Sequence, residues 1–489
     1  MSSHAIATDG AESHRLYIGG KWVESDSGEY ADDLNPYTEE LYARTAKANV
    51  KDADKAMEAA YQARGGWAAT PPAGRAQLLL KAAQLLQERR DEFAGVLIGE
   101  GGGTFGKAMF EIAQTVDLLQ TAAGDAKHIL GKSFHTDPSR LSISIRKPRG
   151  TVVAISPWNF PLILSMYKVA YALATGNTVV FKPASDTPVI GVKIAELFDH
   201  AGVPAGVLNV LTGPGSVLGD ALIEDERCSF VAITGETETG RHVAQTAAKH
   251  LKEYTLELGG KNPLIILKDA DVDYAVDTAA FGTFMHQGQI CMSVGRIIVE
   301  DPIADEFTEK LAKKARSLSY GDPSQPTTVV GPLINRAAVA KVERLVRDAE
   351  RKGAEVLTGG TFDGNVYSPT VLAPVRPEME IFYEETFGPV ASIIAVKDEE
   401  AALHVANDTT FGLSSAVVTN DLAKALYVAE RLEAGMVHVN NAPVDADASC
   451  PFGGVKWSGQ GREGGQHSID ELTEVSWVTM EKQKKQYPF

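Results

Sequence analysis

Cysteine is scarce in this sequence. Its 489 residues contain three cysteines, Cys228, Cys291 and Cys450, which are odd in number and far apart. That pattern does not support a disulfide framework or a CxxC metal site. It fits a reducing compartment, so we expect a cytoplasmic protein with no catalytic metal.

Basic clusters and long apolar runs are also lacking. Lysine and arginine total 47 against 64 aspartate and glutamate residues, which gives a formal net charge of −17. Such a surface repels phosphate backbones and anionic lipid, so we expect no nucleic-acid partner. Residues 1–15 lack the basic and apolar parts of an export signal, and no apolar run is long enough to cross a bilayer. We therefore expect no membrane partner.

What is present is the composition of a globular protein, with 44% hydrophobic and 23% charged residues. A chain of this length exceeds one ordinary core, so two or three domains are expected. Residues 1–15 are predicted to be a disordered leader, and residues 16–25 a hairpin around a Gly-Gly pair. Apolar residues at three- and four-residue spacing predict scaffold helices over about 50–130. Within them, GGGTFGKA is similar to a phosphate-binding loop, but Ala108 replaces the magnesium-binding hydroxyl, so we predict a turn between helices.

From about residue 142 the sequence alternates between apolar strands and amphipathic helices. SISIRKPRGTVVAIS, 142–156, is predicted to be one strand that passes from an exposed sheet edge into a buried parallel sheet. Successive βα units up to about residue 258 predict a doubly wound, Rossmann-like sheet of the kind that binds dinucleotides. The usual GxGxxG fingerprint is absent after its first strand, so other groups must hold the cofactor.

A second α/β region is predicted from about Asn262 to about Gly461. The tail carries an alternating strand that could pair with SISIRKP or with another subunit, and such an open edge indicates a homodimer or homotetramer. The expected fold class is therefore α/β, with a doubly wound cofactor domain, a second α/β catalytic domain and a small β oligomerisation element. The expected limits are 1–127 and 149–258 for the dinucleotide-binding domain, 259–461 for the catalytic domain, and 128–148 and 474–489 for the oligomerisation strands.

The candidate nucleophile is Cys291, in FMHQGQICMS. Glycine and amide residues before a cysteine favour exposed backbone that a substrate can approach, although an isolated cysteine is more often a buried thiol. Two possible partners favour the nucleophile: Glu257 in TLELGGKNP and Asn159 in SPWNFP. Alone, Glu257 could pair with Lys261, and Asn159 could be a turn residue before a proline. Together the three supply a nucleophile, a carboxylate base and an amide donor for acyl chemistry.

Eight segments occur in a characteristic order along nearly the whole chain, from LYIGGKWVES to PFGGVKWSGQGRE. The others are PWNFP, FKPAS, ITGETETG, LELGGKNP, QGQIC and ETFGPV. In this set the chain resembles the aldehyde dehydrogenase superfamily, and QGQICMS and GGGTFGKAMFE look most like the benzaldehyde and vanillin dehydrogenase branch. The resemblance implies an aldehyde dehydrogenase-like fold and an NAD(P)-dependent, non-acylating enzyme that converts an aldehyde to the carboxylic acid.

The resemblance also implies a mechanism. Cys291 attacks the aldehyde carbon, and the Asn159 side chain and the Cys291 backbone N–H hold the oxyanion. The thiohemiacetal loses hydride to nicotinamide, and Glu257 activates the water that hydrolyses the thioester. Glu463, in GQGRE, matches a proton-relay position of the family, although by spacing alone it would be a solvated surface carboxylate.

Cofactor contacts follow from the same resemblance. Lys182 and Ser185 match the contacts to the adenosine ribose, Glu385 the contact to the nicotinamide ribose, and Phe387 the packing against the nicotinamide. Ser185 neither binds a 2′-hydroxyl strongly nor repels a 2′-phosphate, so NADP should be tolerated or preferred beside NAD. A carboxylate at Glu236 would repel the pyrophosphate unless it points away, so its role stays open. The remaining cofactor positions are Ile155, Trp158, Gly215, Gly219, Gly235 and Leu258.

The substrate tunnel implied by position is apolar and aromatic. No arginine or lysine is placed there to hold a second carboxylate, which favours an aromatic or medium aliphatic aldehyde. The alternatives are a semialdehyde dehydrogenase of the same superfamily, a cysteine thiol esterase without redox activity, and a non-catalytic binding protein. The tunnel residues are Phe160, Leu164, Tyr167, Ile290, Met292 and Phe452.

Overall fold

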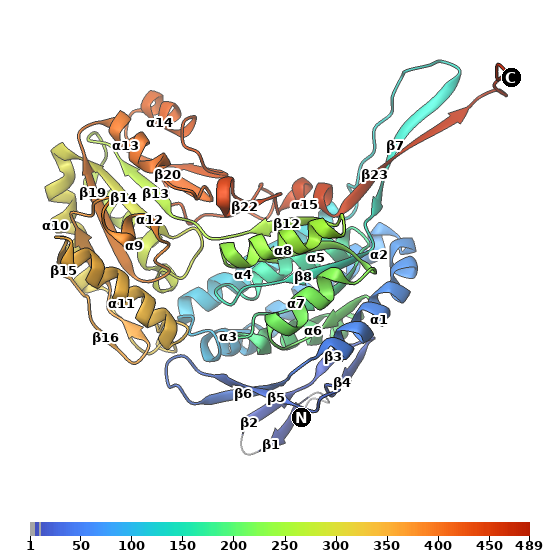
Figure 1. The fold of residues 1–489 in the computed structure, drawn as a ribbon, viewed down its shortest axis with the longest axis horizontal. Coiled ribbons are helices and arrows are strands. Elements are labelled where there is room, and N and C mark those ends of the chain that lie inside the picture. The colour runs from blue at the N-terminus through green and yellow to red at the C-terminus, as the bar shows by residue number, and fades with distance from the viewer. Residues whose placement is uncertain (1–4, 9–10) are drawn as a thin grey trace.

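The computed structural model describes residues 5–8 and 11–489 and contains two α/β parts, each built on its own sheet (Figure 1). The first sheet has eight strands in the order β22-β12-β11-β8-β9-β10-β3-β4. Its five central strands are parallel and are formed by nearly continuous buried apolar runs, as a sheet covered on both faces requires. The strands are β3 (Leu16–Ile18), β4 (Lys21–Val23), β8 (Thr151–Ile155), β9 (Thr178–Lys182), β10 (Leu208–Val210), β11 (Cys228–Thr234), β12 (Glu253–Glu257) and β22 (Gly459–Gln460).

Helices cover both faces of this sheet, because successive strand residues point to opposite sides. Val152 and Ala154 belong to a core shared with α2 to α6, whereas Val153 belongs to a second core shared with α1, α7 and α8. The predicted doubly wound arrangement is therefore present. The helices are α1 (Val50–Ala69), α2 (Pro72–Glu88), α3 (Arg90–Gly99), α4 (Phe105–Asp125), α5 (Ile163–Ala174), α6 (Pro188–Ala201), α7 (Gly215–Glu224) and α8 (Thr237–Lys249).

The predicted scaffold helices and the predicted turn between them are confirmed. α1 to α4 fill residues 50–125, and GGGT lies between the end of α3 and the start of α4. The Thr104 side chain accepts a hydrogen bond from the Lys107 backbone N–H, which caps α4. The hairpin predicted at 16–25 is also present, with β3 antiparallel to β4.

The second sheet has seven strands in the order β15-β18-β19-β14-β13-β20-β21. α9 and α10 pack on one face, and α11 to α14 pack on the other. The strands are β13 (Asn262–Ile266), β14 (Val294–Glu300), β15 (Glu355–Thr358), β18 (Thr370–Ala373), β19 (Val390–Val396), β20 (Ser414–Val418) and β21 (Met436–Val439). The helices are α9 (Val272–Phe284), α10 (Asp301–Ser317), α11 (Arg336–Arg351), α12 (Glu380–Tyr383), α13 (Glu399–Asn407) and α14 (Leu422–Ala429). A two-stranded hairpin of β16 (Phe362–Asp363) and β17 (Val366–Tyr367) lies beside them.

The chain then returns to the first sheet. β22 pairs antiparallel with β12, so the segment after the second sheet forms an edge of the first. α15 (Gly465–Glu471) packs against α4 and α5. This return places the GQGRE segment next to the strand that ends at Glu257.

Two sequence-based predictions are wrong. The leader is not disordered over its described part, because β1 (Ala5–Thr8) and β2 (Ala11–His14) join β5 (Tyr30–Leu34) and β6 (Leu41–Ala46) in a four-stranded sheet; residues 1–4 and 9–10 lie outside the described residues. The stretch 142–156 is two strands instead of one. β7 (Arg140–Pro148) ends at a proline, and Gly150, at φ 129°, turns the chain into β8.

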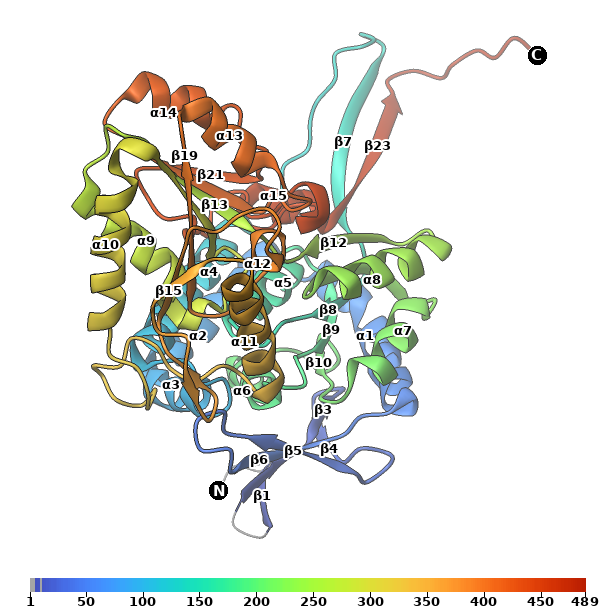
Figure 2. The ribbon, with the colours of Figure 1, turned by 60° about the vertical axis from the view of Figure 1, so that its left-hand side comes forward.

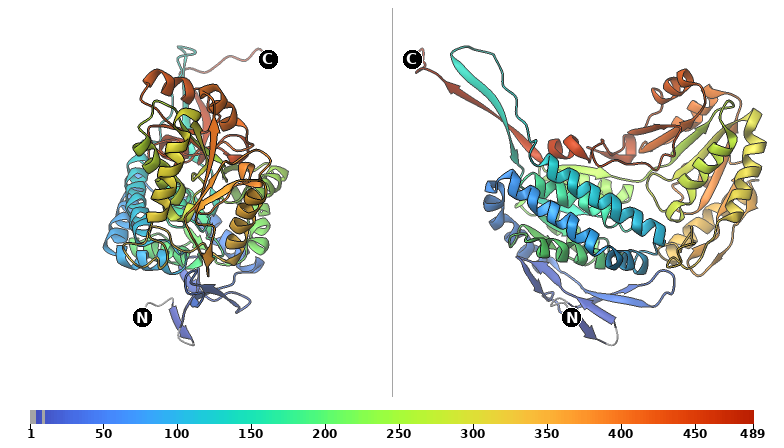
Figure 3. Two further views of the ribbon diagram at one scale, coloured as in Figure 1. Left: turned by 90° about the vertical axis from the view of Figure 1, so that its left-hand side faces the viewer. Right: turned by 180° about the vertical axis from the view of Figure 1, so that it is seen from behind.

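β7 and β23 (Thr473–Glu481) form a separate antiparallel ribbon of nine residue pairs. The ribbon extends away from the body of the molecule in every view (Figures 1 to 3). The prediction that the tail strand can pair with SISIRKP is confirmed. Among the described residues no helix combines the length and the apolar character that crossing a bilayer requires.

Candidate active site

The loop that carries Cys291 follows α9 and has an unusual backbone. His286, Gln287 and Gly288 have φ values of 47°, 56° and 70°, and a Cβ on Gly288 would lie 2.2 Å from a backbone oxygen. The amide side chains beside the cysteine hold this loop: the Gln287 amide donates to two backbone carbonyls outside it (3.1 and 2.9 Å), and the Gln289 Oε1 accepts a backbone N–H at 2.9 Å. The two glutamine side chains therefore fix the backbone of the loop that carries Cys291.

Cys291 is half-buried at the end of this loop. Burial, followed by the Glu385 and Glu257 carboxylates, raises the pKa of its thiol to about 12, and the backbone N–H groups of Met292 and Cys291 oppose the rise. The Asn262 side chain donates to the Cys291 carbonyl at 2.8 Å and anchors the loop to β13. At neutral pH the sulfur of the free site is thus a thiol.

Asn159 comes from the first α/β part, between β8 and α5, and reaches this loop. Its buried side-chain amide donates to the Gln289 carbonyl, two residues before Cys291, at 2.9 Å. An amide nitrogen carries two N–H groups, so a second donor remains. The structure therefore brings the predicted amide and the predicted nucleophile together.

Glu257 is the last residue of β12 and is buried. Within the described part of the chain neither of its carboxylate oxygens has a hydrogen-bond partner. Burial and then the nearby Glu463 raise its pKa well above the ordinary value, and Lys168 and Arg462 oppose the rise. The alternative pairing with Lys261 is absent, because that ammonium donates to the Thr386 hydroxyl at 3.2 Å. A buried, unpaired carboxyl of this kind is unusual outside a reactive site.

Glu463 is not a solvated surface carboxylate. It is buried, its backbone pairs with that of Phe452 in both directions, and its Oε1 accepts from the Lys168 ammonium at 2.8 Å. Lys168 also donates to the Thr234 hydroxyl at 2.6 Å. Sequence reasoning missed Lys168. Its signal is a single lysine in α5, whose residues from 164 to 174 are all buried.

The predicted adenosine-ribose position combines a buried cation with a helix N-terminus. Lys182 ends β9, burial lowers its pKa to about 8, and its hydrogen bond is to the Pro183 carbonyl at 3.0 Å. A Cβ on Gly215, the first residue of α7, would lie 4.0 Å from the Lys182 nitrogen. Ser185 is exposed and donates to the Gly213 carbonyl at 3.3 Å. The Lys182 ammonium and the positive N-terminal end of α7 meet here, and together they suit an anionic or hydroxylated ligand.

The other predicted cofactor residues lie on several elements of the two α/β parts. The Glu385 carboxylate is largely buried and accepts the Gly260 backbone N–H at 2.9 Å, and the Phe387 ring packs edge-on against Trp158 at 5.4 Å. α8 begins at Thr237 with Glu236 as its N-cap residue and without a side-chain cap, so its first N–H groups are open to an anion. Gly219 lies in α7, Ile155 ends β8, Gly235 follows β11, and Leu258 packs against α8. These residues fit a dinucleotide.

The six predicted tunnel residues belong to one apolar cluster against which Cys291 packs. Tyr167 and Phe452 stack with ring centroids 5.8 Å apart and planes 25° apart, and Phe160 meets the His286 ring edge-on at 5.3 Å. Aromatic side chains therefore dominate the part of this cluster that the predicted tunnel residues occupy.

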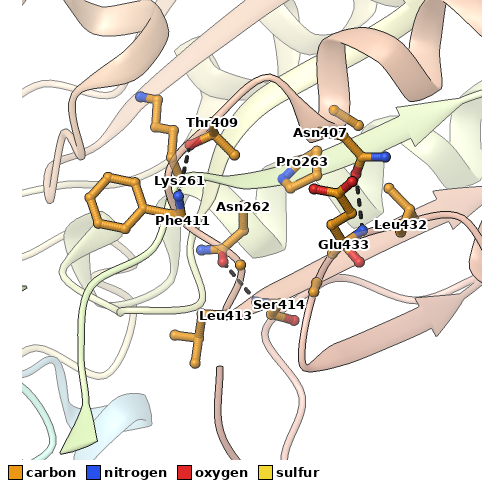
Figure 4. Close-up of a pocket in the computed structure, with 14 residues that line it drawn as sticks. Lys261, Asn262, Pro263, Asn407, Thr409, Phe411, Leu413, Ser414, Leu432 and Glu433 are labelled. Atoms are coloured by element: carbon orange, nitrogen blue, oxygen red, sulfur yellow. Dashed lines mark hydrogen bonds between the residues drawn. The ribbon is translucent and has the colours of Figure 1, made fainter. Parts of the chain in front are cut away.

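A shallow recess lies elsewhere in the second α/β part, and residues of 261–263, 406–415 and 432–434 line it. Figure 4 shows Lys261 and Asn262 among the residues that line it, and the Asn262 side-chain oxygen accepts the Ser414 backbone N–H at 3.0 Å. None of the predicted site residues lines it. Over residues 5–8 and 11–489 no group of three or more His, Cys, Asp or Glu side chains is placed to hold a metal ion.

Comparisons with known proteins agree with this geometry. The model of the Aldehyde dehydrogenase family matches residues 22–478. The benzaldehyde dehydrogenase (NAD+) of Pseudomonas putida is 42% identical over 475 residues, which are 96% of this chain and 97% of the relative. The vanillin dehydrogenase of Corynebacterium glutamicum is 41% identical over 473 residues, 96% of this chain and 98% of the relative. The crystal structure of a salicylaldehyde dehydrogenase from Pseudomonas putida G7 superimposes with a TM-score of 0.95 at 39% identity, covering 98% of this chain and 100% of that one. The predicted fold class and the predicted resemblance are confirmed.

Proposed function

The chain belongs to the aldehyde dehydrogenase family and is a nicotinamide-dependent aldehyde dehydrogenase, and on this premise we propose that it oxidises aromatic or other apolar aldehydes through a thioester on Cys291. The observation that carries the proposal is the convergence of three groups. The Asn159 amide is bound to the Cys291 loop at 2.9 Å. Glu257 is buried at the end of β12 with both carboxylate oxygens unpaired, and it contributes to the raised pKa of the Cys291 thiol.

In the proposed reaction the Cys291 sulfur forms a bond to the aldehyde carbon, and the carbonyl oxygen becomes an oxyanion. The second N–H of Asn159 and the Cys291 backbone N–H hold that oxyanion. Because burial and two carboxylates hold the thiol pKa at about 12, thiolate forms when positive charge enters the site. The positively charged nicotinamide ring of a bound, oxidised dinucleotide would supply that charge and would accept the hydride that leaves the former aldehyde carbon as the oxyanion collapses to the Cys291 thioester.

Glu257 acts in the second half of the reaction. Its raised pKa makes it a stronger base than an exposed glutamate, and its free oxygens can take a proton from the water that attacks the thioester. Glu463 and Lys168 form a hydrogen-bonded pair at 2.8 Å, and the charges of both act on Glu257; we assign them the return of that proton to solvent. The sulfur leaves and the carboxylic acid is released.

We assign the cofactor to the groups around Lys182, Ser185, Glu385 and Phe387. Ser185 is neutral and exposed, so it leaves room for a ribose with or without a 2′-phosphate. We therefore expect both NAD and NADP to be used. Glu236 is proposed to point away from the pyrophosphate, whose anchor is then the open N-terminus of α8.

The apolar cluster and its stacked Tyr167–Phe452 pair favour an aromatic aldehyde over a dicarboxylic semialdehyde. The test is a spectrophotometric panel of benzaldehyde, aliphatic aldehydes and succinic semialdehyde, with NAD and NADP in parallel and Cys291→Ala as the inactive control. Benzaldehyde should give the higher kcat/KM. Succinic semialdehyde far ahead of benzaldehyde would overturn the substrate class. Ester cleavage indifferent to cofactor, with no NAD(P)H formed, would favour a thiol esterase.

Assembly and location are further proposals. The β7–β23 ribbon exposes Leu141, Val475 and Trp477, with exposed fractions of 42%, 62% and 65%, and we propose that it pairs subunits in a homodimer or homotetramer. The sparse cysteines favour the cytoplasm. The domain limits 1–127 with 149–258, and 259–461, are proposed as cooperative units that limited proteolysis can test.

A further inference from the structure

The segment GGGTFGKAMFE, which is similar to a phosphate loop, has no part in the chemistry described so far. Its two charged residues, Lys107 and Glu111, lie one turn apart on α4 and point inward. Their side chains are 2% and 0% exposed, and the Lys107 nitrogen lies 2.5 Å from the Glu111 Oε2. A buried ion pair adds little net stability, because desolvation offsets the attraction between the charges. The contacts that the pair makes therefore matter more than its energy.

Both members of the pair contact the turn that follows Asn159. The second oxygen of Glu111 accepts the backbone N–H groups of Leu162 and Ile163 at 2.8 and 3.1 Å. The first N–H groups of a helix have no acceptor within the helix, and the N-cap residue of α5 provides none from its side chain. Glu111 therefore supplies the missing acceptor. The Lys107 ammonium lies 4.3 Å from the centroid of the Phe160 ring.

The same segment also contacts the loop of the nucleophile. The Gly102 carbonyl accepts from the Gln287 side chain at 3.1 Å, and the Phe160 ring packs against His286. One short stretch before and within α4 therefore touches the turn that carries the amide and the loop that carries the sulfur.

We propose that Lys107 and Glu111 are positioning residues that set the place of the Asn159 amide relative to Cys291. Neither touches the reacting atoms. Glu111 fixes the first turn of α5 and Lys107 fixes the Phe160 ring, so the residue before Phe160 has little freedom. Misplacement of a donor by an ångström can cost orders of magnitude in rate. The inference rests on the proposed function, in which Asn159 binds the oxyanion.

The experiment is a double-mutant cycle on the full chain with benzaldehyde and NAD. Glu111→Gln keeps an oxygen for the two N–H groups but turns an amide NH2 toward Lys107. We expect kcat/KM to fall about tenfold in the wild-type background and less than about twofold in the Asn159→Ala background, because the amide on which the pair acts is then gone. An equal fall in both backgrounds would overturn the proposal. Lys107→Met and Glu111→Asp repeat the cycle if Glu111→Gln does not fold.

A second measurement separates positioning from damage to the loop. Alkylation of Cys291 by iodoacetamide forms no oxyanion, so its rate should stay within about twofold of the wild-type rate in Glu111→Gln. A loss of alkylation as large as the loss of oxidation would mean that the pair only maintains the loop, and would refute the positioning role.

The chain offers a matched control. Glu100 accepts the backbone N–H groups of Val189 and Ile190 at 2.8 Å each, at the start of α6. Glu100→Gln makes the same chemical change at a different helix, so its effect should be equal with and without Asn159. A Glu100→Gln effect that also vanishes in Asn159→Ala would show that the cycle lacks specificity and would count against the proposal. Absence of aldehyde oxidation in the wild type would instead refute the proposed function.

Discussion

Glu257 has two features that a base needs, an uncommitted carboxylate and a raised pKa. Because it is assigned to the water that cleaves the thioester, Glu257→Gln should leave the first turnover and slow the later ones, by about 10²- to 10⁴-fold. Stopped-flow absorbance should then show a burst of NADH, and intact-mass spectrometry should show acylated Cys291. Glu253→Gln, an exposed change on the same strand, is the control. Unchanged turnover in Glu257→Gln would contradict this assignment.

The charge of the side chain at position 185 should decide how well NADP is used relative to NAD. A carboxylate here would accept a hydrogen bond from a free 2′-hydroxyl and repel a 2′-phosphate, so Ser185→Glu should lower the ratio of kcat/KM for NADP over NAD at least about tenfold. Steady-state kinetics with both cofactors measure it, and Ser324→Glu, in another exposed loop, should leave the ratio unchanged. An unchanged ratio in Ser185→Glu would place the 2′-position elsewhere.

The site residues that could be predicted from the sequence are those that lie within a recognisable motif. Cys291, Asn159 and Glu257 come from separate segments, and the structure joins Asn159 to the Cys291 loop by a hydrogen bond and places Glu257 where its charge acts on the thiol. Lys168 was missed because its neighbours in α5 are ordinary apolar residues. Its partner, Glu463, was assigned by resemblance alone. Lys168 and Glu463 are 295 residues apart, and they meet because the chain returns to the first sheet. The local periodicity of the sequence does not predict that return.

At the scale of elements, central strands and long helices are predictable because their apolar periods are regular. The N-terminal strands are not, since β2 forms by pairing with β6, a strand about thirty residues away that offers an open edge. The stretch 142–156 fits one strand or two by alternation alone. Its division follows from Pro148 and Gly150, which end one strand and redirect the next.

The contact between β5 and α3 gives an element-scale prediction about pH. Burial raises the pKa of Asp33 to about 8, Asp186 adds to the rise and Glu100 opposes it, while burial and Asp33 raise the pKa of Glu100. The folded protein therefore keeps protons that the unfolded chain releases above pH 4, and stability falls as pH rises toward 8. Asp33→Asn removes this penalty, so it should raise Tm by about 2 °C or more at pH 8 and change it little at pH 4.

Differential scanning fluorimetry across pH measures this effect. Asp32→Asn is the control, because its side chain lies on the exposed side of the same strand and pairs with Arg44 at 2.9 Å. A Tm gain in Asp33→Asn that is equal at pH 4 and pH 8 would show that the carboxyl does not titrate between them, contrary to the raised pKa.

At the scale of the whole molecule, the β7–β23 ribbon is the part that the single chain leaves uncovered (Figure 3). An isolated two-stranded ribbon is marginally stable in water, and this one exposes apolar side chains on both strands. A second subunit that covers it would remove both problems. Val475, 62% exposed, is the clearest probe, since Trp477 also binds the Ser142 hydroxyl within the ribbon.

Val475→Glu should shift the protein to smaller species in size-exclusion chromatography with light scattering, because a carboxylate would be buried without a partner in the interface. Its matched control is Leu422→Glu: Leu422 is 82% exposed at the first residue of α14, on the opposite side of the molecule from the ribbon (Figure 1), and the substitution should leave the assembly unchanged. Aldehyde oxidation should persist in the smaller species, since every proposed site residue comes from one chain. If Val475→Glu elutes as the wild type does, the ribbon is not the interface; if activity is lost with the assembly, the site depends on a neighbouring subunit.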